Sequence, residues 1–571
     1  MNSRARRNHI AHAGFPIALA VALALTAGIA RAANVVIVNI DGANEGFNDP
    51  TAAPPVGNNA GLTVGQQRLN IFNHAGQIWG GLLPSAVTIR VEAAFDPLAC
   101  TATTAILGQA GAPFGYANFG GAPITNTVYP AALANKLHGS DLDPASNDIE
   151  AQFNSRLNGN VTCLNGVGWY YGFDGNEGVN IDLLPVVLHE IGHGLGFATS
   201  TSLTTGEFAL VGVPDIFARK ILDKTQNKHW DQLTAAQRLA SAINTNNVVW
   251  DGQNTTLASP LVLGPRTVVA VNSPAVIAGT FSANSASFGA HLSATGVTGA
   301  IVLVDDGTAP NSDACTPIVN AAQISGKIAF IDRSNACTFA SRAARAQAVG
   351  AIGVIIANNG AGALVPGGSD STITIPVVGI SLADGNIVRA QLGAGVNATL
   401  KLDLTQNAGA DAQGRVLLFT PNQVQPGSSI SHWDVAALPN LLMEPAINSD
   451  LQAGSVDLTE FVFRDIGWFD GATDAGNAPL ATRIVSNAPN PFNPATKIRF
   501  DLAVTGPAHL AVYDLSGRLV KRILDGSLTA GAHALPWDGT DGRGRGVAAG
   551  VYLARLEADG QSFAHRMVLV K

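Results

Sequence analysis

Residues 182–197 read DLLPVVLHEIGHGLGF, and this stretch determines how the rest of the chain is interpreted. Its apolar residues recur at helical spacing and would form one buried face. Asp182 can cap the first turn by accepting a backbone hydrogen bond. Gly194 and Gly196 can end the helix and turn the chain away. The pattern predicts a buried helix that carries polar residues in its second half.

Those polar residues are His189, Glu190 and His193. Histidines four positions apart share one face of a helix, so both imidazoles can reach one metal ion. Neutral imidazole nitrogen suits Zn²⁺, which lowers the pKa of a bound water toward ~7. The Glu190 carboxylate lies beside the first histidine and can take a proton from that water without binding the metal. The spacing therefore predicts a catalytic zinc site that still needs a third protein ligand.

The matching positions His189, Glu190, His193 and Gly196 resemble the signature of the metzincin peptidases, which runs HExxHxxGxxH. The last position departs from that signature, because Thr199 stands where the third histidine is expected. This departure rules out the short form of the signature, so the third ligand has to come from another part of the chain.

One metzincin branch, the leishmanolysin-like group, places the third histidine beyond an inserted domain, in a Ser-His-Trp segment that precedes a methionine turn. Residues 431–433 read SHW and are followed by Met443, one of three methionines in the chain. The resemblance implies His432 as third ligand of a single catalytic zinc, and Met443 as the turn beneath it. An ordinary role in folding stays open for both residues. Rival third ligands are Glu207, Asp215 and His229.

The N-terminus has the features of a secretory signal peptide. Basic residues precede an apolar run at 15–30, and an Ala-Arg-Ala sequence at 30–32 suits a signal peptidase, so cleavage is expected after residue 32. The run is too short for a stable membrane span. Removal of its four arginines would change the net charge from −8 to −12. A mildly acidic exported chain has no electrostatic basis for binding nucleic acid.

An exported chain meets an oxidising compartment, so the four cysteines are expected to form two disulfides. Three pairings are possible. We pair neighbours, because each pair then lies inside one proposed domain. The predicted disulfides join Cys100 to Cys163 and Cys315 to Cys337.

Residues of about 260–405 resemble the protease-associated (PA) domain. The resemblance is carried by GKIAFIDR at 326–333, GAIGVIIANN at 350–359 and IPVVGIS at 375–381. Domains of this family occur in secreted peptidases and receptors as lids or partner surfaces and carry no chemistry. The resemblance implies an inserted α/β domain, and it supports the Cys315–Cys337 pairing because both cysteines fall in this unit.

Residues of about 482–571 resemble the Ig-like C-terminal modules of exported bacterial proteins, related to the flagellar hook-capping Ig domain and to type IX secretion sorting tails. NAPNPFNP at 487–494 and DLSGR at 514–518 carry this resemblance, among short strands at the spacing of a sandwich. It implies an all-β module that could contact the cell surface or secretion machinery. DGTDG at 538–542 could suggest calcium, but a hairpin loop explains it without an ion.

Together these features predict a multidomain α+β protein. The metzincin-like catalytic domain is expected in two parts, with the stretch 98–180 rich in loops. The PA domain lies between the two parts, and a linker precedes the Ig-like sandwich. The expected units are a signal peptide at 1–32, catalytic segments at 33–254 and 409–470, the PA domain at 255–408, the linker at 471–481 and the Ig-like module at 482–571.

We expect a secreted zinc-dependent endopeptidase, extracellular or on the surface of a bacterium, that hydrolyses peptide bonds of protein or peptide substrates with Glu190 as general base. The alternative is a non-catalytic extracellular binding or adhesion protein that uses its PA and Ig-like modules and keeps a vestigial metal site. Glu190 separates the two, because a structural zinc site has no need for that carboxylate. A weaker alternative is metal-assisted hydrolysis of a non-peptide bond.

Overall fold

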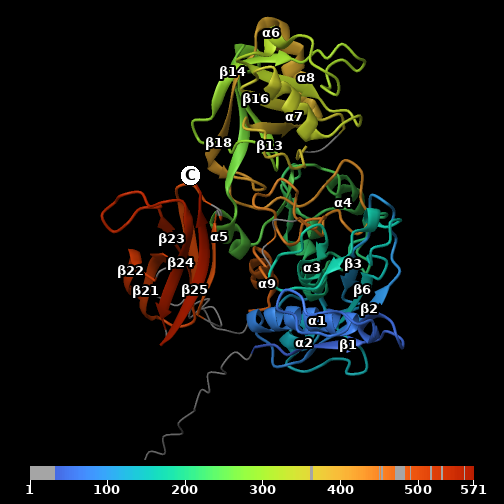
Figure 1. The fold of residues 1–571 in the computed structure, drawn as a ribbon. Coiled ribbons are helices and arrows are strands. Elements are labelled where there is room, and N and C mark those ends of the chain that lie inside the picture. Colours follow the sequence, from blue (N-terminus) through green and yellow to red (C-terminus); the bar gives the residue numbers. More distant parts are fainter. Residues whose placement is uncertain are drawn as a thin grey trace, which may run out of the picture.

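The computed structural model has three bodies, an N-terminal helix-rich body, a barrel and a C-terminal sandwich (Figure 1). The predicted signal peptide, through residue 31, and the predicted linker at 471–481 lie outside the described residues. The structure describes residues 32–570 except 361–363, 449–450, 452–453, 470–481, 489, 491, 515–516, 529–530 and 559.

The first body is built on a four-stranded sheet of order β1-β2-β6-β3. Strands β1, β2 and β6 are parallel, and β3 runs antiparallel to β6 at the edge. Helices α1 and α3 pack against each other beside this sheet. The bounds are β1 (Val35–Asn39), α1 (Val64–Leu82), β2 (Ile89–Asp96), β3 (Gly108–Gly111), β6 (Ile149–Asn154) and α3 (Leu183–Leu195).

The prediction that residues 98–180 are rich in loops holds for most of this stretch, but the stretch also supplies elements of the sheet. This stretch contains β3, the central strand β6 and helix α2 (Ala131–His138). Strand β6 reads IEAQFN, so polar residues interrupt its short apolar alternation and weaken the strand signal. The remaining short elements of this body are β4 (Gly115–Ala117), β5 (Val128–Pro130), β7 (Trp169–Tyr170), β8 (Ile181–Asp182), β9 (Ile221–Asp223), β10 (Lys228–His229), α4 (Ala235–Ser241) and β11 (Val248–Trp250).

Helix α3 forms where its apolar face and cap predict it. The Asp182 carboxylate accepts a hydrogen bond from the Leu184 N–H at 3.0 Å, as a cap should. Gly196 ends the helix with φ 123°. Gly194 does not end it, because it lies inside the helix, where an added Cβ would meet the Ile149 side chain at 2.3 Å. Gly194 therefore allows α3 to lie close against β6.

The chain returns to this body after the barrel. The Leu418 N–H donates to the Val248 carbonyl at 3.0 Å, which joins the returning segment to β11. Helix α9 (Thr459–Ile466) then packs on α1 and α3, and the Trp468 indole N–H donates to the Leu195 carbonyl at 2.9 Å. One hydrophobic core contains side chains from both segments.

A closed barrel of order β12-β13-β17-β16-β15-β14-β18 follows helix α5 (Gln253–Val262). Its first and last strands pair antiparallel, so the chain enters and leaves the barrel on neighbouring strands. This arrangement lets the barrel interrupt the first body without separating its two segments. The elements are β12 (Pro265–Ser273), β13 (Gly279–Ser285), β14 (Val297–Leu303), α6 (Ala321–Ile324), β15 (Ile328–Asp332), α7 (Phe339–Ala348), β16 (Gly353–Ala357), β17 (Val377–Ile380), α8 (Leu382–Gln391) and β18 (Asn397–Asn407).

The C-terminal body is an all-β sandwich. Its two antiparallel sheets have the orders β19-β20-β23 and β22-β21-β24-β25. Their inner faces share a core that includes the fully buried Trp537. The strands are β19 (Arg483–Ala488), β20 (Thr496–Leu502), β21 (Gly506–Asp514), β22 (Leu519–Leu528), β23 (Gly531–Trp537), β24 (Gly550–Ala558) and β25 (Gln561–Leu569).

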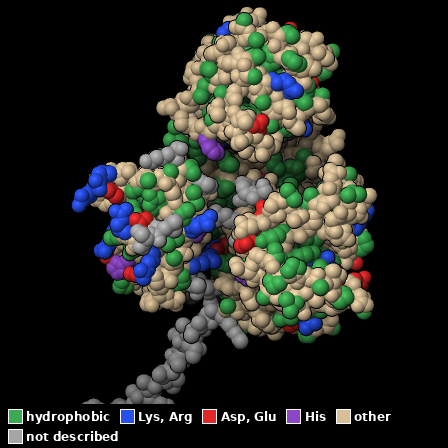
Figure 2. Space-filling view, viewed as in Figure 1, with side chains coloured by type: hydrophobic (Ala, Val, Ile, Leu, Met, Phe, Trp, Pro, Cys, Tyr) green, Lys and Arg blue, Asp and Glu red, His purple; other side chains and the backbone are tan. Residues whose placement is uncertain are grey.

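Both predicted disulfides are confirmed. Cys100 is bonded to Cys163 and Cys315 to Cys337, with Cα–Cα distances of 5.2 and 5.6 Å. Within the described part of the chain, no helix has the length and apolar character that a membrane crossing requires. Figure 2 shows Lys and Arg side chains gathered on the C-terminal sandwich in this view, whereas the other two bodies show mostly uncharged side chains.

Candidate metal centre

Three buried imidazoles meet between the two segments of the first body. The Nε2 atom of His193 lies 3.0 Å from that of His189 and 3.2 Å from that of His432. The Nε2 atoms of His432 and His189 are 3.2 Å apart. Among the described residues, this is the group of metal-ligating side chains close enough to hold one ion. The structure therefore brings His432 to the helix histidines, 239 positions away from His193.

Backbone carbonyls fix the orientation of each ring. Nδ1 lies 2.7 Å from the Leu442 carbonyl in His189, and 2.8 Å from the Phe197 carbonyl in His193. In His432 it lies 2.8 Å from the Ser428 carbonyl. Because a carbonyl only accepts, each Nδ1 carries the proton, and each Nε2 presents a lone pair to the other two. Metal-bound histidines commonly show this pattern.

This donor set fits a zinc ion. Tetrahedral zinc binds nitrogen at about 2.0–2.1 Å, which would separate the nitrogens by about 3.3 Å, close to the spacing seen here. Burial lowers the pKa of His189 to about 4. Burial, assisted by the neighbouring His189, lowers the pKa of His193 to about 3. The imidazoles are therefore neutral near pH 7, which is the form that binds metal.

Glu190 lies beside the three histidines but is not one of the clustered groups. Its carboxylate accepts a hydrogen bond from the Ala110 N–H on edge strand β3. A Cβ added at Gly108 would stand 3.0 Å from Glu190 Oε1, so β3 passes close to the carboxylate. Burial raises the pKa of Glu190 to about 8. A carboxyl group that titrates near neutral pH can both accept and return a proton.

Met443 lies directly beneath the metal-binding turn of α3. It is fully buried, and an added Cβ at Gly192 would stand 3.0 Å from the Met443 sulfur. The Met443 carbonyl accepts from the Trp433 N–H at 2.8 Å, which ties this segment to the one that carries His432. Gly192 therefore lets α3 approach the segment that supports His189 through the Leu442 carbonyl.

Thr199 and Asp215 have a structural role next to the centre. The Thr199 N–H donates to Ser431 Oγ at 3.2 Å, which joins the end of the helix region to the His432 segment. Asp215 accepts from the Thr199 hydroxyl at 2.8 Å, from Ser200 at 2.8 Å and from the Ala218 N–H at 2.7 Å. Its carboxylate is thus occupied by protein donors, and Asp215 is not part of the histidine cluster.

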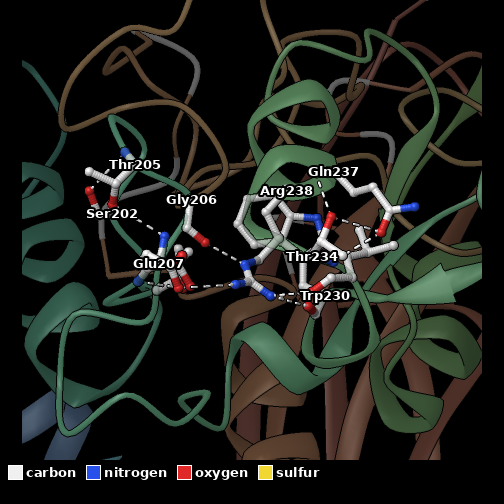
Figure 3. Close-up of polar contacts among 11 residues, drawn as sticks. Ser202, Thr205, Gly206, Glu207, Trp230, Thr234, Gln237 and Arg238 are labelled. Carbon is white, nitrogen blue, oxygen red and sulfur yellow. Dashed lines mark hydrogen bonds and ion pairs between the residues drawn. The ribbon is translucent and has the colours of Figure 1, made fainter.

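The other two rival ligands also lie elsewhere. Figure 3 shows Glu207 facing Arg238, whose guanidinium is 3.9 Å from the Glu207 carboxylate. Arg238 also donates to the Gly206 carbonyl at 2.5 Å, which holds the loop that carries Glu207. His229 pairs with Asp251 at 2.9 Å. The expectation that one of these residues competes with His432 is not met by the geometry.

Sequence reasoning missed the backbone groups of the site. The carbonyls of Leu442, Phe197 and Ser428 orient the histidines, and the Ala110 N–H holds Glu190. A backbone carbonyl has no residue-specific signal, so no sequence pattern could have identified these groups. The alternation of β3 is too short to be recognised, since the strand reads GQAG.

The loop considered for calcium holds a protein cation instead. Lys521 Nζ lies 2.7 Å from Asp538 Oδ1 and 2.7 Å from Thr540 Oγ1. The ammonium group therefore pairs with the first acid of this loop in the structure.

Two family profiles match parts of the chain. The PA domain profile matches residues 297–388, and the profile of the FlgD Ig-like domain matches residues 486–562. The predicted resemblances to a PA domain and to a hook-capping Ig-like domain are confirmed, and the protein is a multidomain α+β chain that contains both.

Several similar proteins are aminopeptidases. The chain is 30% identical over 154 residues to probable leucine aminopeptidase 2 of Aspergillus fumigatus, covering 24% of this chain and 30% of that protein. The aminopeptidase from Aneurinibacillus sp. strain AM-1 is 28% identical, over 25% of this chain and 31% of that chain, with a TM-score of 0.20. The zinc aminopeptidase BSAP from Bacillus subtilis is 24% identical, over 26% of this chain and 35% of that chain, with a TM-score of 0.19.

The chain thus spans about a third of the length of these relatives. An aligned stretch of 154 residues is shorter than the 243 positions that separate His189 from His432. The similarity to the Aspergillus protein therefore cannot include all three histidines.

Proposed function

We propose that this protein is a zinc-dependent endopeptidase with a metzincin-like centre of the leishmanolysin-like branch, in which one zinc ion is held by His189, His193 and His432. The observation that carries the proposal is the set of three buried Nε2 atoms within 3.0–3.2 Å of one another, with every Nδ1 directed at a carbonyl. Buried polar atoms normally have a hydrogen-bond or metal partner, so three acceptors directed at one point favour a cation between them.

In the proposed peptide hydrolysis, the bound metal and Glu190 have separate roles. Zinc, when bound, supplies a Lewis acid that polarises a carbonyl oxygen and makes water a better nucleophile near pH 7. The Glu190 carboxylate takes the proton of the attacking water at Oε1 and returns one to the leaving amine. Glu190 is buried, which limits its contact with bulk water. No side chain forms a covalent intermediate in this scheme.

The edge strand β3 supports an extended peptide substrate. Strand β3 pairs with β6 on one side only, and among the described residues no strand covers its other edge. The Ala110 N–H on this edge is used by Glu190, and the remaining main-chain groups of an open edge can bind an extended peptide through hydrogen bonds. Because β3 passes within van der Waals distance of Glu190, a peptide on this edge would bring its backbone past the metal centre. Such a site has no requirement for a free N-terminus, which favours internal cleavage.

The second candidate is an aminopeptidase. It is favoured by the probable leucine aminopeptidase of Aspergillus fumigatus, whose name states cleavage from the N-terminus. The alignment with that protein argues against this candidate, because it is too short to include the whole metal centre. We therefore place the endopeptidase first and make the choice an outcome of the experiment.

We further propose that the enzyme acts outside the cell, secreted or at the surface of a bacterium. The two disulfides support this proposal, because such bonds persist in oxidising compartments. The FlgD-type Ig-like module supports a contact with the cell surface or secretion machinery.

The test compares wild type, Glu190→Gln and the control Glu207→Gln, all as the full mature chain. Zinc content, casein hydrolysis and cleavage of one peptide with a free or an acetylated N-terminus would be measured. We expect about one zinc per chain in all three proteins. Glu190→Gln should lose about 10²–10⁴-fold in kcat/KM while keeping zinc. Glu207→Gln should behave as wild type, because Glu207 is exposed.

Each outcome has a defined meaning. Cleavage of the acetylated peptide supports an endopeptidase, and cleavage of the free peptide alone supports an aminopeptidase. Zinc without any peptide cleavage favours a non-catalytic binding protein or hydrolysis of another bond. A wild-type chain that binds no zinc would falsify the proposal.

A further inference from the structure

The C-terminal sandwich contacts helix α9 through a network of ion pairs. Arg483 on β19 lies 2.9 Å from Glu460 on α9 and 2.9 Å from Asp501 on β20. Arg464, one turn further along α9, binds the other Glu460 oxygen at 2.7 Å. Glu460 has only 10% of its side chain exposed, so the pairs are largely screened from water. One charged cluster therefore spans two bodies of the molecule.

Asp457, just before α9, connects this cluster to the metal centre. Its carboxylate accepts from the N–H groups of Leu458 and Thr459 at the start of the helix, and from the Leu442 N–H. The Leu442 carbonyl in turn accepts from His189 Nδ1 at 2.7 Å. Asp457 is held at φ 38°, in the left-handed region that few side chains adopt. Two hydrogen bonds to the backbone of one residue, Leu442, thus link Asp457 to His189.

The positive charges that balance Asp457 and Glu460 come mainly from the sandwich. Arg499 on β20 interacts electrostatically with both acids and donates to Ser486 Oγ at 2.7 Å, which orients its guanidinium. Helix α9 itself supplies only Arg464 to this cluster. Carboxylates removed from water are stable only when paired charges or hydrogen bonds replace the lost solvation. Without Arg483 and Arg499, the two acids would lose most of the positive charge that balances them.

We propose that the Ig-like sandwich docks on the N-terminal end of α9 and positions the metal centre, with Arg483 and Arg499 as positioning residues. By balancing Asp457 and Glu460, the sandwich holds the Leu442–Met443 segment and, through it, the His189 ring. The sandwich is then a working part of the folded enzyme and not a passive tail. This inference goes beyond the proposed function. Its zinc-loss and cobalt-spectrum readouts rest on the proposed metal site, whereas hydrogen–deuterium exchange does not.

The test uses the full chain with Arg483→Gln and Arg499→Gln, singly and together. Arg518→Gln is the matched control, because Arg518 lies in the same sandwich and pairs with Asp514 on the exposed surface. Hydrogen–deuterium exchange would be followed at 438–444 and 457–466, and zinc loss to a chelator would be timed. The visible spectrum of the cobalt-substituted protein reports the ligand geometry. Arg483→Lys and Arg499→Lys keep the charge and serve as rescue variants.

We expect the double Gln variant to exchange faster in both segments and to shift the cobalt spectrum. It should lose zinc about threefold to tenfold faster than wild type, which is near the low end of the effects seen when groups that support metal ligands are removed. The Lys variants should recover most of the difference, and Arg518→Gln should match wild type. Equal exchange, spectrum and zinc loss in the Gln variants and wild type would overturn the docking role.

Adding Glu460→Gln to Arg483→Gln should increase the exchange rate by less than the two single changes predict together, and additive effects would also contradict the contact. If the wild type binds no zinc, the proposed function fails, while the exchange data still decide the docking.

Discussion

The metal centre and the buried arginine of the barrel are two buried polar clusters, and their polar atoms find partners in different ways. Arg342 on α7 is fully buried and donates to the carbonyls of Asp332 at 3.0 Å, Ser334 at 2.7 Å and Cys337 at 3.1 Å. These partners lie within ten positions of it in the sequence. The barrel cluster is therefore local, and carbonyls accept from both terminal nitrogens of Arg342, while its buried Nε has no hydrogen-bond partner.

The three histidines are assembled from segments 239 and 243 positions apart, and they direct three acceptors at one point. Their Nδ1 protons are already used by carbonyls. A buried donor held by protein carbonyls contributes to folding, whereas a cluster that leaves acceptors facing each other favours a bound cation. The comparison suggests that substitutions in the two clusters will separate zinc binding from stability.

The largest effect is expected from His432→Ala. Structural zinc sites are worth about 10–16 kcal/mol, or about 2.5–4 kcal/mol for each of four ligands, so zinc affinity should fall by roughly 70- to 900-fold. The control is His229→Ala, which removes a histidine of the same body that pairs with Asp251. Competition with a zinc indicator measures both affinities. Equal zinc affinity in the two variants would remove His432 from the ligand set.

The second effect concerns the barrel. Arg342→Met keeps the length of the side chain but leaves three carbonyls without their donor, which should lower the free energy of unfolding by about 3 kcal/mol. Zinc affinity should stay within about twofold of wild type, because no ligand depends on Arg342. Arg389→Met is the control, since Arg389 lies in the barrel at the surface. Denaturant unfolding and zinc titration give the two values, and a loss of zinc would show that the clusters are coupled.

The third effect is a pH dependence of the metal-free protein. The pKa of His189 is lowered by burial to about 4, below its ordinary value of 6.5. Between these values the unfolded chain binds more protons than the folded one, so stability is present above pH 6.5 and is lost as the pH falls toward 4. Between pH 7 and pH 5 the loss should be about 2 kcal/mol for this one histidine. Urea unfolding at both pH values measures it, and His189→Gln should shrink the difference, because Gln does not titrate.

Sequence alone predicted much of the metal centre and both disulfides, for reasons that differ, but nothing in it pointed to the Arg342 cluster. The spacing of His189, Glu190 and His193 is a helical pattern with a direct chemical meaning, so the helix and these residues could be placed without a structure. His432 came only from a resemblance, because no periodicity connects residues 239 positions apart. The disulfides followed from the proposed division into domains, and the geometry agrees with them.

What sequence could not supply is the surroundings of the site. Strand β3 has four residues with little apolar alternation, although it holds Glu190 in place. The Leu442 carbonyl is a backbone group that any residue would offer at that position. The pairing of Arg483 with Glu460 depends on how two bodies pack, which composition does not reveal.

The smallest effect tests whether Met443 contributes through its volume or through its sulfur. Met443→Leu nearly conserves volume, so it should lower the free energy of unfolding by less than about 1.5 kcal/mol and leave zinc affinity almost unchanged. Gly192→Ala is the informative partner, because the added methyl would stand 3.0 Å from the Met443 sulfur and must displace it. It should cost about 1–3 kcal/mol, and more than Met443→Leu. Thermal unfolding of the zinc-loaded proteins measures both costs. If Met443→Leu instead loses zinc while Gly192→Ala is tolerated, the sulfur itself matters to the metal centre, and packing beneath α3 does not explain its position.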